Sequence, residues 1–282
     1  MEKRIRYSTE YSDQLARLLE DHKVPYTRSD EELRRNGFDD LVYTISERHP
    51  QFELLSKRLI SFPQTSVLET VHYSEQERLN AEWLTIRAFS TKVVLCREEE
   101  TFVCSGYYKD GAMAHHRGLT GAPFYVAGPL RHSRHQNFFC SHEASDYHIF
   151  CTGRSKQTLE SADAEICFAK VLRASTGEPI DDLYYMDFQN PLPVEAVFPD
   201  NCPEQYICPC CGRITYFPPM YPLKIRRGDF AGCRTACKTA EMFSFGGNIT
   251  FSLPMISQAL YRVLKENALL RGLDISPVEI VE

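Results

Sequence analysis

The chain has 282 residues, of which 43% are hydrophobic and 25% charged, and its formal net charge is -6. This composition is that of an ordinary globular protein, and the length is enough for one large domain or two smaller ones. The acidic balance disfavours binding along a nucleic-acid backbone, which needs a basic face. It is compatible with a basic protein partner.

The N-terminal stretch MEKRIRYSTEYSDQ lacks the apolar segment of a secretory signal, and no apolar run approaches the roughly 18 residues of a membrane helix. We therefore expect a cytoplasmic protein with no membrane partner, whose cysteines stay reduced. The eleven cysteines are an odd number, so they cannot all pair within one chain.

The first 95 residues contain no cysteine, whereas all eleven cysteines lie between residues 96 and 237. Leucines at helical spacing predict a helix within residues 10–22, and a second apolar stripe predicts another within residues 49–63. The change in cysteine content indicates that the N-terminal part of the chain is distinct from the rest.

A third helical pattern occupies residues 72–89, where a serine followed by glutamate three residues later resembles a capping box. Leu79, Trp83 and Ile86 then fall on one stripe, and we expect Trp83 to anchor a core. Together the three patterns predict a mainly helical region over residues 1–95.

After residue 91 the sequence is richer in β-branched and aromatic residues, and TKVVLC, TFVCSGYY and AEICFAKVLRA are typical of strands. A proline-rich stretch at residues 190–205 predicts an irregular connector. Near the C-terminus, Ile256, Leu260 and Leu264 form a helical stripe. Gly272 is expected to end this helix, and LDISPVEIV then returns as a strand.

The C-terminal segment is weakly similar to an earlier segment of the chain. An alignment of the two segments matches Ile166, Phe168 and Val171 with Leu273, Ile275 and Val278. The pattern predicts an α+β fold in which two similar units, residues 96–190 and 191–282, follow the helical region. The alternative, two ordinary strand–helix–strand units without common origin, stays open.

The stretch ICPCCGRITYF places two cysteines, Cys208 and Cys211, at the spacing of a zinc knuckle, with Gly212 directly behind them. Two thiolates at this spacing can bind one ion, and the glycine lets the chain turn tightly beneath it. The pattern predicts a structural zinc site in the second unit.

A tetrahedral site needs two further ligands, and Cys233 and Cys237 lie at a suitable distance downstream. Their CxxxC spacing is looser than that of a second knuckle, so Cys202, Cys210 or a histidine could substitute for one of them. Other interpretations of these thiols are a redox pair, a nucleophile and metal-free structural cysteines.

No P-loop, GxGxxG or GxSxG motif is present, and we recognise no catalytic constellation, so we do not expect an enzyme. Residues 131–148 are rich in histidine and arginine and could form an anion or nucleic-acid patch, although a solvated loop is the simpler interpretation. The acidic pairs in GFDD and PIDDLYYMDF are typical of turns.

The stretch from ICPCCGR through EMFSFGGNITFSLPMISQALYRVLKENALLRGLDISPVEIV resembles the C-terminal half of the double-CxxCG family of bacterial proteins. The resemblance covers roughly the last 75 residues. It implies an immunity-type protein that binds and neutralises a toxin delivered by a neighbouring cell. In the first unit only Cys104 and Gly106 match the expected CxxCG, which argues against a metal ion there.

Two function classes therefore remain. The first is a cytosolic protein-binding module with a structural zinc ion and a protein partner, which the resemblance implies is a toxin. The second is a zinc-containing enzyme or nucleic-acid-directed protein that uses the histidine-rich segment at residues 131–148. Four thiolate ligands would favour the first class, because catalytic zinc keeps an open position and commonly uses histidine and glutamate.

Overall fold

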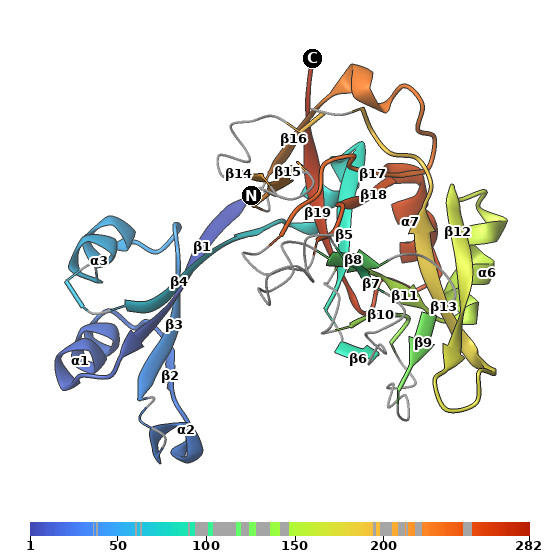
Figure 1. Cartoon of the computed structure of the whole chain (residues 1–282). Helices are drawn as coiled ribbons and strands as arrows, with labels where there is room; N and C mark the ends of the chain where they lie inside the picture. Colours follow the sequence, from blue (N-terminus) through green and yellow to red (C-terminus); the bar gives the residue numbers. More distant parts are fainter. Residues whose placement is uncertain are drawn as a thin grey trace. The chain divides into compact units, whose positions relative to one another are not determined.

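The computed structural model describes residues 1–35, 37, 39–59, 61–62, 64–89, 91–93, 101–103, 117–119, 124–127, 136–141, 147–193, 196–197, 205–207, 212, 214–217, 222–244 and 250–282. By its contacts the chain divides into two compact units, Met1–Glu75 and Gln76–Glu282 (Figure 1). The domain limits expected from the sequence, after residues 95 and 190, stay predictions.

The first unit is built around an antiparallel sheet with the strand order β2-β3-β1-β4. Its strands are β1 (Glu2–Glu10), β2 (Tyr26–Arg28), β3 (Asp40–Ser46) and β4 (Gln64–His72), and its helices are α1 (Asp13–Asp21), α2 (Glu31–Arg35) and α3 (Phe52–Leu59). Alternate residues of β1, namely Ile5, Tyr7 and Thr9, are buried. Ile5 and Tyr7 share a core with leucines of α1 and α3.

The prediction of a mainly helical N-terminal region is therefore wrong. The helices expected within residues 10–22 and 49–63 are present as α1 and α3, but they pack against a sheet. The alternation in EKRIRYSTE is the signal of a strand with one buried face. The signal is weak because only two of the three buried positions, Ile5 and Tyr7, are apolar, whereas the third is Thr9.

The second unit contains two larger sheets. Their orders are β6-β10-β11-β13-β12-β9 and β16-β19-β5-β18-β17. The strands of the first are β6 (Thr91–Val93), β9 (Phe124–Val126), β10 (Phe138–Ser141), β11 (Phe150–Cys151), β12 (Ile166–Arg173) and β13 (Pro179–Phe188). Those of the second are β5 (Trp83–Ala88), β16 (Leu223–Arg226), β17 (Ala236–Lys238), β18 (Pro254–Ser257) and β19 (Leu273–Val281).

Short elements complete the second unit. Two hairpins join β7 (Thr101–Val103) to β8 (Arg117–Leu119) and β14 (Gln205–Ile207) to β15 (Ile214–Tyr216). The helices are α4 (Glu75–Asn80), α6 (Gly153–Ser161), η2 (Arg227–Phe230) and α7 (Gln258–Glu266). Helices α6 and α7 contact each other, and Figure 1 shows them side by side.

The two larger sheets share one topology. The order β10-β11-β13-β12-β9 corresponds to β17-β18-β5-β19-β16, and every corresponding pair has the same direction, with only the last pair in each series parallel. The helices correspond too, because α6 follows β11 and α7 follows β18. Thr152 caps α6 and Ser257 caps α7, each through its side-chain oxygen.

In each sheet the middle strand comes from the other half of the second unit, if that unit is divided between β12 and β13. Strand β5 precedes β6 to β12 in the sequence, yet it lies between β18 and β19. Strand β13 begins the C-terminal half, yet it lies between β11 and β12. The two halves of this unit are thus interlocked by an exchange of equivalent strands.

This exchange corrects the predicted fold class. The structure is mostly sheet with short helices, and it is not a helical region followed by α+β units. Residues 191–282 do not complete their own sheet, because the central strand β5 lies far outside that range. A single core joins both sheets and contains Ile86, Phe138 and Met186.

Trp83 and Ile86, expected on a helix, lie on β5. Five of the six residues of this strand are buried, with Leu84 and Ile86 in the core shared by the sheets and Trp83 in a second core. A strand covered on both faces gives a continuous apolar run whose spacing also suits a helix. Trp83 does anchor a core, as expected, and stacks on Phe230.

Candidate thiol site

Two of the four predicted zinc ligands, Cys233 and Cys237, lie together at the start of β17. Helix η2 ends at Phe230, whose carbonyl accepts a hydrogen bond from the Cys233 N–H at 2.9 Å. Strand β17 then begins, so that Cys237 is fully buried while Cys233 is half-buried. The two thiol groups are in hydrogen-bonding contact.

The contact between the thiols makes them unequal. The hydrogen bond from Cys237 lowers the pKa of Cys233, because it stabilises the thiolate of the more exposed partner. The same hydrogen bond and burial raise the pKa of Cys237. Cys233 is therefore the thiol that ionises first and meets an incoming ion or reagent first.

The loop that carries the thiols is held by Glu165, which precedes β12 in the other half of the unit. Its Oε2 accepts hydrogen bonds from the N–H groups of Arg234 (2.8 Å) and Thr235 (2.9 Å), and its Oε1 from Nε of Arg234 (3.2 Å). Burial by itself raises the pKa of Glu165. The hydrogen bonds from Thr235 and Arg234 outweigh burial and lower this pKa to about 2.

The other two predicted ligands, Cys208 and Cys211, fall outside the described residues, as do Cys202 and Cys210. They belong to the segment between β14 and β15, in which Gly212 has a φ of 71°. This conformation favours glycine, as the knuckle pattern requires. Strand β15 ends at Tyr216, which forms a bridge with Phe243.

The donor chemistry of the described residues fits half of a zinc site. Tyr216 packs against the hydrophobic cluster that also contains Cys233 and Cys237, so the hairpin and the thiol pair meet in one core. Two adjacent thiols are the ligands that zinc prefers in structural sites. Among the residues that the structure describes, no group of three or more His, Cys, Asp and Glu side chains is placed to bind a metal ion.

The hairpin also exposes apolar side chains. Ile207 on β14 and Ile214 on β15 are cross-strand partners, and 57% and 41% of their surfaces are exposed. Phe217, directly after β15, is 46% exposed. Exposed apolar side chains that lie together are typical of protein contact surfaces.

Of the histidine-rich segment at residues 131–148, His148 is described and His132, His135 and His142 are not. His148 is buried, and burial together with the nearby charge of Lys238 lowers its pKa to about 4. It is therefore a neutral side chain at pH 7. The predicted anion patch otherwise lies outside the described residues.

Cysteines elsewhere in the described residues differ in environment. Cys140 and Cys151 are buried in the core between the sheets, and burial raises the pKa of Cys151. Cys167 on β12 is exposed. Cys140 and Cys151 thus act as small hydrophobic residues.

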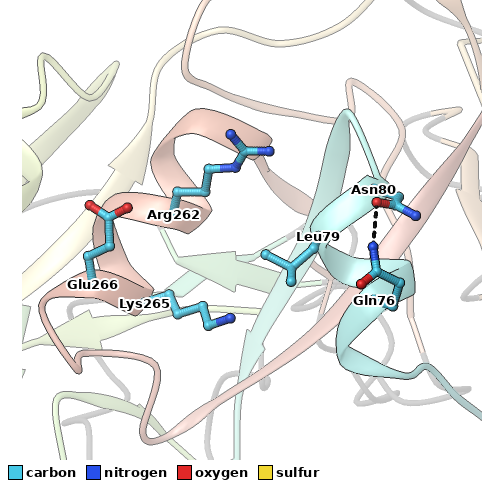
Figure 2. A pocket seen from close by; sticks show the side chains of 6 residues that line it. All are labelled: Gln76, Leu79, Asn80, Arg262, Lys265 and Glu266. Carbon is cyan, nitrogen blue, oxygen red and sulfur yellow. Dashed lines mark hydrogen bonds between the residues drawn. The ribbon is translucent and has the colours of Figure 1, made fainter.

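A shallow pocket lies between α4 and α7 (Figure 2). Arg262, Lys265 and Glu266 line it from α7, and Leu79 forms part of the α4 side. On the α4 side, Gln76 donates a hydrogen bond to Asn80 at 2.9 Å. The side chains of Arg262, Lys265 and Glu266 place positive and negative charges on the same face of α7. The pocket therefore does not favour a ligand of one charge.

Sequence reasoning missed Glu165. The only signal is an acidic residue before a strand, and its role depends on a loop about seventy positions away that only the tertiary structure brings near.

No helix of the described residues is long and apolar enough to span a membrane. No family model matches the chain, and no curated protein matches it.

Proposed function

We propose that the protein is a protein-binding module of the immunity-protein type, built around a structural zinc ion. The ligands would be Cys208, Cys211, Cys233 and Cys237. A bound zinc ion with four thiolates would supply a cross-link between the hairpin and β17, and no acid–base or redox chemistry. The proposal places the protein in the cytoplasm, where thiols stay reduced.

The observation that carries this proposal is the position of the β14–β15 hairpin. It exposes Ile207 and Ile214 at one end and joins the core of the thiol pair through Tyr216 at the other. A two-stranded hairpin is only marginally stable by itself. A metal ion bound by Cys208 and Cys211, in the segment that connects the two strands, would hold the adjacent apolar end in a fixed shape for a partner.

The partner class follows from the resemblance and from charge. The resemblance to immunity proteins favours a toxin as the partner. The net charge of -6 favours a basic protein, since opposite charges speed encounter. We do not propose an enzyme.

The test is photocrosslinking in the native cell with a reactive amino acid in place of Ile214. We expect one protein adduct, which disappears when Ile207→Asp is added. Leu54→Asp is the matched control, because Leu54 is 42% exposed and lies in the first unit. A folded protein that gives no adduct, or one that turns over a small molecule, would contradict the proposal.

A further inference from the structure

The segment between Cys233 and Cys237 is joined to the loop before β12 by hydrogen bonds in which each side both donates and accepts. Besides the bonds that Glu165 accepts, its own N–H donates to Oγ1 of Thr235 at 2.9 Å. That hydroxyl in turn donates to the carbonyl of Asp163 at 3.2 Å. Two residues of one loop, Asp163 and Glu165, therefore fix both the backbone and the side chains of Arg234 and Thr235 in the other loop.

The fixed residues lie directly between the ligands. Arg234 and Thr235 follow Cys233, and one further residue separates them from Cys237. A carboxylate that binds consecutive N–H groups sets the direction of those peptide units, because each N–H must point at the same oxygen. With these peptide units fixed, the half-exposed Cys233 is held beside the buried Cys237.

The corresponding place in the other sheet supports a special role for the carboxylate. There the start of β10 meets the segment before β19. The Asn137 N–H donates to the Arg271 carbonyl at 3.2 Å. The strand registers place Phe139 where the other sheet has Cys237. The carboxylate thus occurs on the side that carries the thiols.

We infer that Glu165 is a positioning residue for the thiol pair, which holds the Cys233–Cys237 turn in the shape that binds a soft divalent cation. The part of this inference that concerns the metal rests on the proposed zinc site. Because Glu165 lies between α6 and β12, it also links that site to the first of the two interlocked sheets. Loss of the carboxylate loosens the turn without removing a ligand.

The experiment compares Glu165→Ala, Glu165→Gln and Arg234→Ala in the full chain. Co²⁺ absorbance and competition of Zn²⁺ with a chelator measure metal affinity. Iodoacetamide labelling of Cys233 in the metal-free protein, followed by peptide mass spectrometry, measures how well the turn is held. Asp274→Asn is the matched control, because Asp274 pairs with Arg87 at 2.7 Å on another strand pair.

We expect Glu165→Ala to weaken Zn²⁺ binding by about 10–100-fold, as for other residues that orient metal ligands, and to speed labelling of Cys233. Arg234→Ala removes the guanidinium contact but leaves both N–H groups in place, so its effect should be smaller. Asp274→Asn should change neither quantity.

The outcomes separate this inference from the proposed function. Glu165→Ala with wild-type metal affinity and wild-type labelling overturns the positioning role. Wild-type protein that binds no metal, combined with faster labelling in the variant, overturns the zinc site and retains the positioning role. If Glu165→Ala unfolds, Glu165→Gln takes its place, because glutamine weakens the bonds to the N–H groups by losing the charge and loses the acceptor for Nε of Arg234. Weaker Zn²⁺ binding and faster labelling of Cys233 in that variant support the positioning role, and wild-type values of both overturn it.

Discussion

The rings of Trp83 and Phe230 stack with centroids 4.6 Å apart and an angle of 11° between their planes. Trp83 lies on the exchanged strand β5, and Phe230 ends η2, three residues before Cys233. This stack therefore joins the strand exchange to the loop that carries the thiols.

Replacement of Trp83 by alanine should destabilise the second unit by about 3–5 kcal/mol, as large aromatic truncations in cores do. The free energy of unfolding from urea titrations followed by circular dichroism measures it. Trp83→Phe, which keeps a stacking ring, should lose clearly less. Equal losses in the two variants would show that the stack itself contributes little.

Replacement of both Cys208 and Cys211 by serine tests the structural role of the metal. Loss of a cross-link of this span corresponds to about 3 kcal/mol, which lowers the Tm of a unit of this size by about 6–12 °C. Hydrogen exchange should accelerate across residues 206–240. Cys167→Ser, at an exposed cysteine, is the control and should change neither measurement. A double variant that stays fully folded yet loses all partner binding would contradict a purely structural site.

His148 should make stability fall in mildly acidic solution. Its pKa is about 4 in the folded protein and about 6.5 when free, so the unfolded chain binds a proton first as the pH drops. The contribution of His148 to the free energy of unfolding is therefore fully present above pH 6.5. It falls by about 3 kcal/mol in all as the pH drops from 6.5 to 4. Urea titrations at pH 7 and pH 5 measure the loss, and His148→Gln should reduce it by about 2 kcal/mol. An unchanged difference between the two pH values would refute the assignment.

Gly272 occupies a position where a side chain is excluded. Its φ is 100°, and an added Cβ would lie 2.5 Å from the carbonyl oxygen of Phe138. Gly272→Ala should therefore cost about 3 kcal/mol or more, from backbone strain plus the displacement of β10. Gly177→Ala is the matched control, since its φ is 70° but its surroundings are open. It should cost about 1 kcal/mol, and similar melting temperatures for the two variants would exclude the steric contribution.

The strand exchange predicts how the second unit responds to a cut. A protease site inserted at the exposed turn between β12 and β13, near Gly177, should be cleaved without separating the two pieces. Each piece holds the middle strand of the other's sheet, so they should elute together in size-exclusion chromatography until denaturant is added. A cut in the segment between the hairpin strands β14 and β15 is the comparison. The first piece then keeps β13 with the rest of its sheet, so only β5 joins the two pieces, and they should separate at a lower denaturant concentration. Separation of the pieces without denaturant would contradict the exchange.

The sequence by itself determined the local elements with strong periodicity or clear end signals. It located α1, α3, β12 and β19, and it placed Trp83 in a core, because apolar spacing and turn residues act within a few positions. It also matched Ile166 with Leu273 and Phe168 with Ile275, and the strand registers opposite Met186 and Ile86 put the same residues at equivalent places.

Only the tertiary structure decided the rest. Strand β13, whose PIDDLYYMDF suggested a turn, is the centre of a sheet because burial between β11 and β12 outweighs the turn preference of its two aspartates. Strand β5 is not helical because both its faces are covered by parts of the chain that follow it at long range. Glu165 acquires a role at the thiols for the same reason: the contacts that define it join residues far apart in sequence, and no local pattern records them.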